Sequence, residues 1–599
     1  MSTAFLLITI YLSLAPSHAP CSASAWIFPK IFRHPKFDYE MVVIGAGASG
    51  MFAAGTASAF GFKTLLIEKE IGDNNGVGGD CTNAACVPSK AVRSVAKTKV
   101  AAELATVVTH LKSTNQWLHL ARAHSTAAVE AVRKRENSAP DTEKNPNLDI
   151  VFVQDCNFVS NHEIKLKGNQ GETAMTSRVV SAKKIIIATG SSPLLPEVLK
   201  NAADRANIPY DTYRSLLHPS SPSTHPEEDD SLWNILNRVR SESYEGPRIP
   251  PKIVLIGGGA TACELGQALG RIGGEDMEII IVAPKMLPTE DYSLQEAAVT
   301  ILARDNCRLR LGARVLDILK VEEDEGQSRG LLLLDDGETV PVDRIIFCLG
   351  RTPEQSLASL NLENAGIAWM PDEGVMVNTY LRSKTVGHVY AAGDCASAIY
   401  PRDRRAIHAG WTGFHAVRNA LIPWFLRSPA VHPCVPRVVY TDPEMASAGQ
   451  SHQECVERYG DGGFDHLRVN EEGMDRADMD RVERSIDGNF VELRAEKISG
   501  RIIGATACGP AASETINEVC LAIVNKMTVR DIARTLHSYP SHGYTLYRIS
   551  MALATQSLSG LLSGCGPVGR CLSVMIRLLQ RLLVFIRIPW VKSKLVDVI

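Results

Sequence analysis

The sequence predicts an α/β fold with two Rossmann-like dinucleotide-binding domains, each built in three layers. Two glycine-rich motifs indicate it, because each follows a short apolar run and precedes a stretch with helical character. The length of 599 residues exceeds the needs of one hydrophobic core, so several domains are expected. With 45% hydrophobic and 22% charged residues the chain is neither wholly disordered nor collagen-like. The formal net charge of -3 gives no electrostatic footprint for nucleic acid.

The first glycine-rich motif is YEMVVIGAGASG, residues 39–50, and its apolar run predicts a buried parallel strand. Gly45 permits the tight turn, Gly47 lets a pyrophosphate approach the backbone, and Gly50 lets the next helix pack closely. A second strand, FKTLLIEKE, carries Glu68 about 20 residues further on, where a carboxylate accepts ribose hydroxyls. The region is therefore predicted to hold a dinucleotide.

The second motif is KIVLIGGGATACELG, residues 252–266, with Gly257, Gly259 and Ala262 in the three glycine places. Its following strand, EIIIVAPK, ends at Ala283 without an acidic residue, and Lys285 comes next. A missing carboxylate removes the partner of a free ribose hydroxyl, while a nearby cation favours a 2′-phosphate. The sequence therefore predicts NADPH as the preferred nucleotide, with NADH as the alternative. Lys285 could instead be an ordinary solvated surface lysine with no role in nucleotide choice.

Two pairs among the fourteen cysteines are close in sequence, a density too low for a disulfide framework. Cys81 and Cys86 lie in GGDCTNAACVPSK, and no partner pair with zinc-site spacing accompanies them, so no bound metal is expected. Redox chemistry fits better, because a distorted helix start can bring positions i and i+5 together and lowers thiol pKa values. The second pair, Cys565 and Cys571, is either a flexible thiol pair or incidental.

The regions between these motifs carry three further expectations. A long helix is predicted from about residue 91 to 134, and KKIIIATGSSP reads as a strand with its following turn. The Pro-, Ser- and acid-rich stretch at 218–230 is predicted to be a surface insertion leading into a short helix.

The N-terminus reads as a signal peptide, with an uncharged core at 4–15 and the small residues of Ala23-Ser24-Ala25 as a cleavage pattern. A retained anchor is the alternative, although the core is shorter than the roughly 18 residues of a spanning helix. The ASAW step and the basic residues that follow resemble the bipartite presequences of algae with complex plastids. The expected destinations are the secretory pathway or a plastid.

The C-terminal segment 574–590 carries three arginines among apolar residues. On a helical wheel Arg577 and Arg581 share one side with Arg570, which precedes the segment, and leucines lie away from them. Such a cationic amphipathic helix suits a membrane surface, while packing on the protein's own body is the equal alternative.

The motifs together resemble those of the pyridine nucleotide-disulphide oxidoreductases. GAGASG, GGDCTNAACVPSK, IIIATGSSP, IGGGATACELG, FCLGRTP and VYAAGDC occur in that family's order, across about residues 38–557. The resemblance implies a homodimeric flavoprotein with a C-terminal α+β dimerisation domain. FAD would bind the first glycine-rich cradle, formed by residues 39–50, and a nicotinamide nucleotide the second, formed by residues 252–266. The resemblance also implies FAD-binding parts at 38–199 and 345–425, an NAD(P)-binding domain at 251–344 and a dimerisation domain at 426–556. The patterns at the two ends add a predicted leader at 1–25 and a basic tail at 557–599.

The same resemblance assigns roles to individual residues. Cys86 resembles the thiol that contacts the flavin, and Cys81 the exposed thiol that attacks substrate. Lys90 and Glu264 resemble the ion pair beside the reactive flavin edge, where a lysine stabilises negative charge. Asp394 resembles the residue that binds the ribityl chain. Three glycines of the shared motifs complete the cofactor contacts: Gly79, Gly190 and Gly350.

One family feature is absent. Glutathione reductases and dihydrolipoyl dehydrogenases carry His-Pro-Thr-x-x-Glu, but alignment on Pro540 places Tyr539 at the histidine and Tyr544 at the glutamate. A tyrosine there, and VVYTDPEMASAG, resemble mercuric reductases, whose soft metal substrate needs thiolates more than a base. The C-terminal vicinal cysteines and the N-terminal CxxC domain of those enzymes are missing. His537 and His542 are candidates to replace the base, or are ordinary solvated or core histidines.

The sequence therefore predicts an FAD-dependent reductase that passes electrons from NADPH through Cys81 and Cys86 to a soft metal ion or a disulfide. One alternative is a conventional small-disulfide reductase that uses His537. Another is a membrane-attached flavoprotein that relays redox state to a partner, suggested by the basic tail.

Overall fold

The computed structural model describes residues 37–69, 77–104, 113–138, 145–168, 177–218, 232–234, 250–322, 328–397, 404–470, 475–479, 488–564 and 575. The chain forms two compact units. The first contains residues 1–83, 129–192 and 351–431, and the second contains 84–128, 193–350 and 432–599. Each unit therefore combines segments that are distant in the sequence.

A seven-stranded sheet forms the centre of the first unit, in the order β3-β2-β1-β6-β5-β4 with β19 also paired to β6. Its strands are β1 (Tyr39–Ile44), β2 (Thr64–Lys69), β3 (Leu148–Val153), β4 (Asp155–Phe158), β5 (Glu163–Lys167), β6 (Arg178–Ile187) and β19 (Val389–Ala391). The pairs among β1, β2, β3, β6 and β19 are parallel, whereas β4, β5 and β6 pair antiparallel. Parallel strands are buried on both faces, which explains the apolar runs MVVI in β1 and III at the end of β6.

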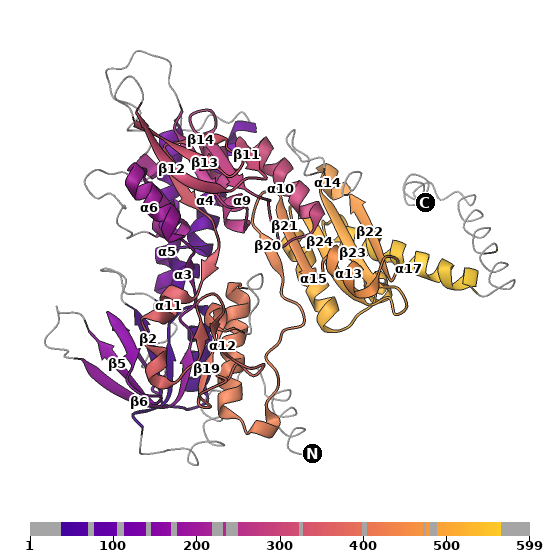
Figure 1. Ribbon diagram of the computed structural model, residues 1–599. Helices are drawn as coiled ribbons and strands as arrows, with labels where there is room; N and C mark the ends of the chain where they lie inside the picture. The colour runs from indigo at the N-terminus through magenta and orange to yellow at the C-terminus, as the bar shows by residue number, and fades with distance from the viewer. Residues whose placement is uncertain are drawn as a thin grey trace. The chain divides into compact units, whose positions relative to one another are not determined.

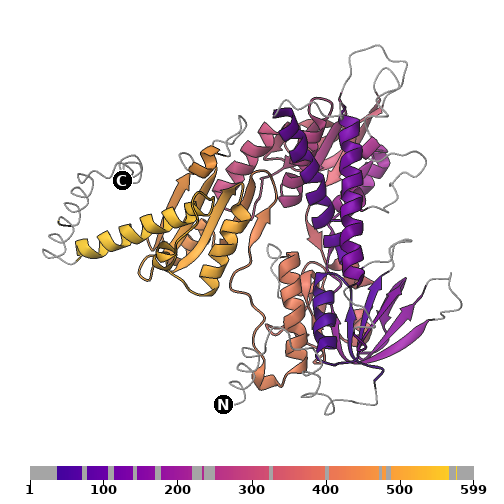
Figure 2. The ribbon, with the colours of Figure 1, turned by 180° about the vertical axis from the view of Figure 1, so that it is seen from behind.

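Two helices lie side by side along this sheet, α2 (Ala48–Ala59) and α12 (Ala406–Leu421) (Figure 1; Figure 2). Small residues make this close packing possible, because a Cβ added at Gly413 would meet the Ser49 carbonyl oxygen at 2.1 Å. The unit also contains α3 (Gly79–Asn83), α11 (Glu354–Ala358), β17 (Trp369–Met370), β18 (Gly374–Val375) and the 3₁₀ turns Leu362–Ala365, Gly393–Cys395 and Trp424–Leu426.

The second unit contains three sheets. The first is parallel, in the order β11-β10-β9-β15-β8, and consists of β8 (Tyr210–Thr212), β9 (Lys252–Ile256), β10 (Glu278–Ala283), β11 (Cys307–Leu311) and β15 (Arg344–Phe347). A small antiparallel sheet contains β12 (Val315–Glu322), β13 (Ser328–Leu334) and β14 (Thr339–Val342). The third, also antiparallel, has the order β20-β21-β24-β23-β22, with β20 (Arg437–Val439), β21 (Glu444–Gly449), β22 (Phe464–Asn470), β23 (Phe490–Glu496) and β24 (Ile502–Gly509).

Helices of the second unit cover these sheets. They are α4 (Cys86–Leu104), α6 (Glu197–Ala206), α7 (Tyr213–Leu217), α9 (Ala260–Gly273), α10 (Tyr292–Arg304), α13 (His452–Tyr459), α14 (Asp475–Met479), α15 (Ala512–Val524), α16 (Val529–Arg534) and α17 (Tyr544–Gly564). At the divisions between units lie α5 (Thr114–Ser138), β7 (Ser192–Pro193) and β16 (Arg351–Thr352). Helix α15 packs on β21 and β24 of the third sheet.

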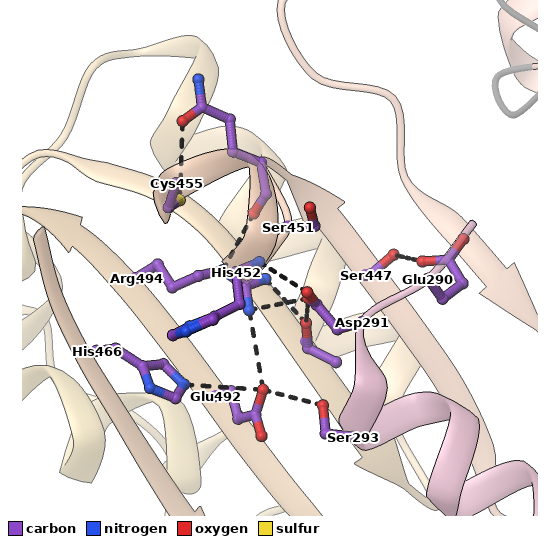
Figure 3. Close-up of polar contacts among 12 residues, drawn as sticks. Glu290, Asp291, Ser293, Ser447, Ser451, His452, Cys455, His466, Glu492 and Arg494 are labelled. Atoms are coloured by element: carbon purple, nitrogen blue, oxygen red, sulfur yellow. Dashed lines mark hydrogen bonds and ion pairs between the residues drawn. The ribbon is translucent and has the colours of Figure 1, made fainter. Parts of the chain in front are cut away.

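A buried charge network ties the start of α10 to the third sheet (Figure 3). The guanidinium of Arg494 is fully buried on β23 and lies 2.9 Å from Asp291, at the N-cap of α10. Thr506 on β24 accepts a hydrogen bond from Arg494 and donates one to Asp291 at 2.6 Å. Ser293 donates to Glu492 at 3.0 Å. Because burying an unpaired charge is costly, these pairings fix α10 against this sheet.

The predicted α/β fold with two dinucleotide-binding sheets and a C-terminal α+β domain is confirmed. The long helix predicted over about 91–134 is instead two helices, α4 and α5, in the described parts of that region. The short helix expected after the acid-rich insertion corresponds, among described residues, only to the 3₁₀ turn Leu232–Asn234. The predicted domain boundaries stay predictions.

Several predictions lie outside the described residues: the leader, most of the acid-rich insertion, Cys565 and Cys571, and the amphipathic segment at 574–590, of which only residue 575 is described. Among the helices that the structure describes, none combines the length and apolar character needed to cross a membrane.

Candidate active site

The first glycine-rich turn has the geometry that the sequence predicts. Gly45 follows β1 with φ +101°, and a Cβ there would meet the Ala188 carbonyl oxygen at 2.5 Å. A Cβ at Gly50 would meet the Gly45 carbonyl oxygen at 1.7 Å, so only glycine lets α2 begin this close to the turn. Gly47 is the N-cap of α2 and forms a parallel β-bridge with Gly78. The next residue, Gly79, packs against the Gly47 backbone. The turn thus directs the N-terminus of α2 at the space beyond β1.

The polar groups around this turn fit a bound dinucleotide. Glu68, near the end of β2, accepts a hydrogen bond from the Ala46 amide within the turn, so its carboxylate is placed at the cradle. The Ser49 hydroxyl is buried in the first turn of α2 and has no hydrogen-bond partner among the described residues. An orphaned hydroxyl at a helix N-terminus matches the requirement of a phosphate for donors. The residues of the first cradle therefore fit FAD.

Asp394 belongs to the same edge of the first sheet, in the 3₁₀ turn that follows β19. Ser191 donates to its carboxylate at 2.6 Å, and the Arg351 guanidinium lies 3.5 Å away. Arg351 also donates to the Ser191 hydroxyl and pairs with Asp80 at 3.0 Å. Gly190, with φ +70° and open space where a Cβ would be, precedes Ser191. The carboxyl ends of the parallel strands β1, β6 and β19 thus bring Gly45, Gly190 and Asp394 to one edge, where open α/β sheets bind ligands.

The second cradle repeats this geometry in the second unit. Gly257 follows β9 with φ +116°, and a Cβ there would meet the Cys348 carbonyl oxygen at 2.5 Å. Gly259 is the N-cap of α9 and has open space around its Cβ position, while Ala262 is fully buried. Gly350, with φ +101° and open space, follows β15 at the same edge. This cradle fits a second dinucleotide.

The end of β10 and the turn that follows it lie beside the second glycine-rich loop. The strand ends at Ala283, which is buried, and Lys285 is exposed in the next turn. A Cβ at Gly258 would meet the Lys285 backbone oxygen at 2.1 Å, and the Leu287 amide donates to the Gly258 carbonyl at 2.7 Å. The Lys285 turn is therefore held against the glycine-rich loop.

The two cysteines lie where a helical path is interrupted. Cys81 is in α3, which ends at Asn83, and Cys86 is the first residue of α4, so Ala84 and Ala85 interrupt the helix between them. Both cysteines are half-buried. The distortion that the sequence argument requires is present, although the division between the two units also falls here.

One turn after Cys86, Lys90 forms the predicted ion pair with Glu264, its Nζ lying 2.6 Å from Oε2. The other carboxylate oxygen of Glu264 accepts the Tyr440 amide hydrogen at 3.0 Å. The Lys90 ammonium also lies over the Tyr440 ring, 4.5 Å from its centroid. Burial raises the pKa of Tyr440 against the opposing effect of Lys90, and the charge of Cys86 contributes to the rise. Helix α4 thus holds the cation one turn after Cys86, α9 holds the carboxylate, and the segment after β20 holds the phenol against this ion pair.

The segment that replaces the usual histidine dyad is open and aromatic. Tyr539 is 50% exposed and its ring lies 5.4 Å from that of Tyr544. His537 has both ring nitrogens occupied by acceptors, with Nε2 3.0 Å from Glu518 Oε1 and Nδ1 2.9 Å from the Thr535 carbonyl. Its side chain is only 8% exposed. Both ring nitrogens of His537 therefore face oxygens of its own chain, while Tyr539 is exposed in the single chain.

Sequence reasoning missed three neighbours of these groups. Tyr440 and Glu518 are far from their partners in the sequence, so no spacing could have revealed them. Arg351 belongs to the FCLGRTP motif, which marked the region but not the role of the arginine.

Two dinucleotide cradles and a cysteine pair followed by a Lys–Glu ion pair define a nucleotide-dependent disulfide oxidoreductase. The chain belongs to the pyridine nucleotide-disulphide oxidoreductases: the family model matches residues 39–419, and that of the family's dimerisation domain matches 435–546.

Similar proteins cover most of the chain. The mitochondrial dihydrolipoyl dehydrogenase of Sus scrofa is 27% identical over 538 residues, spanning 86% of this chain and 90% of that protein. The Homo sapiens enzyme is 27% identical over 529 residues, with the same shares. Among solved structures, the HOCl-induced flavoprotein disulfide reductase RclA from Escherichia coli has a TM-score of 0.65 at 20% identity, covering 85% of this chain and 98% of that one. LpdA from Mycobacterium tuberculosis has a TM-score of 0.66 at 22% identity, covering 86% and 99%. At these identities the structural likeness shows the fold.

Family membership makes this protein an FAD-dependent oxidoreductase that uses NAD(P)H, and its dimerisation domain supports a homodimer. Large apolar side chains on that domain are exposed in the single chain, as an oligomer interface requires. They include Leu521, Val524 and Leu536.

Proposed function

We propose that this flavoenzyme uses NADPH to keep Cys81 and Cys86 as a dithiol, which reduces a soft metal ion or a disulfide with a good leaving group. Bound flavin would supply the two-electron chemistry that links a nicotinamide to a disulfide. Cys81 would attack or bind the substrate, and Cys86 would close the disulfide with it. Lys90, held by Glu264, would stabilise negative charge that develops near Cys86.

The choice of substrate rests on the segment at 537–544, where the structure offers an exposed tyrosine and an already hydrogen-bonded histidine in place of the usual proton donor. Reduction of an ordinary organic disulfide releases a thiolate, and a positioned acid speeds that departure by typically 10²- to 10⁴-fold. A phenol, which titrates near 10, is a weak donor at neutral pH compared with an imidazole, near 6.5. Tyr539 is exposed, and both ring nitrogens of His537 already face acceptor oxygens. A soft metal ion, whose capture requires thiolates, needs no such donor.

The choice of NADPH is supported by the turn after β10. The strand ends at Ala283 without a carboxylate for a free ribose hydroxyl, and the turn places an exposed lysine, Lys285, beside the glycine-rich loop.

The pair His537 and Glu518 favours a second function, a conventional small-disulfide reductase. A histidine oriented by a carboxylate is a familiar acid–base arrangement. In that case the ring must leave the Thr535 carbonyl before Nδ1 can serve a substrate.

Anaerobic NADPH oxidation with mercuric ion, oxidised glutathione or a quinone as acceptor separates these functions. We expect mercuric ion to be accepted well and oxidised glutathione slowly, with faster glutathione disulfide turnover in the double variant Tyr539→His, Tyr544→Glu if the pocket admits that substrate. Fast turnover of oxidised glutathione that is lost in His537→Ala would establish the second function instead. Turnover of the quinone alone would favour a redox relay.

We further propose that the N-terminal leader directs the protein to the secretory pathway or a plastid, and that the basic tail contacts a membrane surface. Fluorescent fusions with and without residues 1–36 or 565–599 test both.

A further inference from the structure

Two cysteines that are far apart in the sequence meet in the last part of the second unit. Cys434 precedes strand β20, and Cys520 is on helix α15. Their sulfur atoms lie 3.3 Å apart. A disulfide bond is about 2.05 Å long, so a small approach of the two side chains would complete one.

The backbone on both sides of this pair is well supported. Cys434 is 3% exposed and belongs to the hydrophobic core under α15, against which the half-buried Cys520 also packs. Helix α15 packs on strands β21 and β24, and β20 pairs with β21 in the same sheet (Figure 1). The core therefore holds the sulfurs close to each other in the reduced protein.

The position of Cys434 gives the pair a structural consequence. The chain passes from the first unit to the second between Val431 and His432, and Cys434 follows directly. A bond to Cys520 would tie the beginning of this last segment to α15, whose outer face carries the exposed Leu521 and Val524.

We propose that Cys434 and Cys520 are a second redox-active thiol pair, which a peroxide oxidises to an intramolecular disulfide. The Cys520 sulfur attacks one peroxide oxygen, the O–O bond breaks, and one water leaves, so that Cys520 becomes a sulfenic acid. The Cys434 sulfur then attacks the Cys520 sulfur, the S–S bond forms, the S–O bond breaks, and a second water carries away the Cys434 proton. Two thiols and one hydrogen peroxide thus give one disulfide and two waters.

Cys520 is the better first nucleophile because it is the partly exposed partner. The hydrogen bond with Cys434 and burial raise the pKa of Cys520, and only Arg437 opposes the rise. Because the thiolate is the reactive form, oxidation should be slow near neutral pH and faster as the pH increases.

The experiment is peptide mapping of the full-length FAD-loaded enzyme after treatment with hydrogen peroxide. Trypsin releases Cys434 in residues 428–437 and Cys520 in residues 502–526, a peptide that also contains Cys508. We expect these two peptides to appear joined after oxidation and to separate on reduction. The joined species should persist in Cys508→Ser and disappear in Cys520→Ser and in Cys434→Ala.

Thermal unfolding provides a second measurement. A disulfide that closes a long loop restricts the unfolded chain, so peroxide should raise the melting temperature of the wild type by several degrees and leave that of Cys520→Ser unchanged. Cys520→Ser should keep the NADPH oxidation rate of the wild type, because Cys520 is outside the proposed electron route. The pairing test therefore stands whatever acceptor the enzyme uses.

The proposal is overturned if peroxide leaves the two peptides separate, with Cys520 carrying only sulfinic or sulfonic acid. It is equally overturned if the joined species persists in Cys520→Ser, since Cys508 would then be the partner.

Discussion

Replacing Glu264 by glutamine tests the ion pair with Lys90. Glutamine keeps the shape of the side chain and an oxygen for the Tyr440 amide, but it removes the charge that lies 2.6 Å from the Lys90 ammonium. At that distance and an effective dielectric constant near 20, the Coulomb energy is about 6 kcal/mol. Because the Lys90 side chain is 33% exposed, water compensates for much of this Coulomb energy. Removing the Glu264 charge should therefore cost about 1.5–3 kcal/mol of interaction free energy.

Such a loss corresponds to roughly a 10- to 100-fold slower reaction where the pair acts in the transition state. We expect Glu264→Gln to slow flavin reduction by NADPH by that factor in anaerobic stopped-flow measurements, with the flavin content unchanged. The matched control is Lys97→Met, also on α4, where Lys97 is 59% exposed and pairs with Asp442 at 3.4 Å. If Glu264→Gln reduces its flavin as fast as Lys97→Met does, the proposed role of the ion pair is wrong.

Three further predictions concern cofactors and stability. Gly50→Ala should purify without flavin, because its Cβ would collide with a backbone oxygen, whereas Gly55→Ala in the same helix, with open space, should keep a full flavin content measured by absorbance. Lys285→Glu should narrow or reverse the preference for NADPH over NADH in steady-state kcat/KM, and equal use of both by the wild type would contradict the argument. Burial raises the pKa of Asp442, but the hydrogen bond and charge of Arg271 outweigh this effect and hold that pKa below 3.8. The ionised Asp442 carboxylate therefore stabilises the folded protein above pH 3.8, and this contribution is lost as the pH falls through the lowered pKa. Asp442→Asn should therefore cost about 1–3 kcal/mol in urea unfolding at pH 7, and the difference from the wild type should shrink in acid.

The cradles were predictable because their signals are local. Gly45, Gly50 and Gly257 are required by turns that involve only neighbouring strands and helices, and a spacing of a few residues encodes such turns. The apolar runs of β1 and β9 likewise specify buried parallel strands without further information.

Long-range partners were not predictable from spacing. Tyr440 reaches Lys90 and Glu264, and Glu518 reaches His537, through tertiary packing alone. The sequence nominated His537 as a base, but it could not show that both ring nitrogens are occupied. It also grouped cysteines by proximity in the chain, so the pair of Cys434 and Cys520 escaped notice.

The central claim is that Cys81 and Cys86 carry electrons from NADPH to the acceptor. The most direct test adds NADPH anaerobically to the oxidised enzyme, labels new thiols with an alkylating reagent and identifies them by mass spectrometry, with mercuric ion turnover measured in parallel. The account predicts new label at Cys81 and Cys86 only, and loss of turnover in Cys81→Ser and Cys86→Ser but not in Cys156→Ser, which alters a half-buried cysteine outside the pair. New label elsewhere, or full turnover in both active-pair variants, would contradict it.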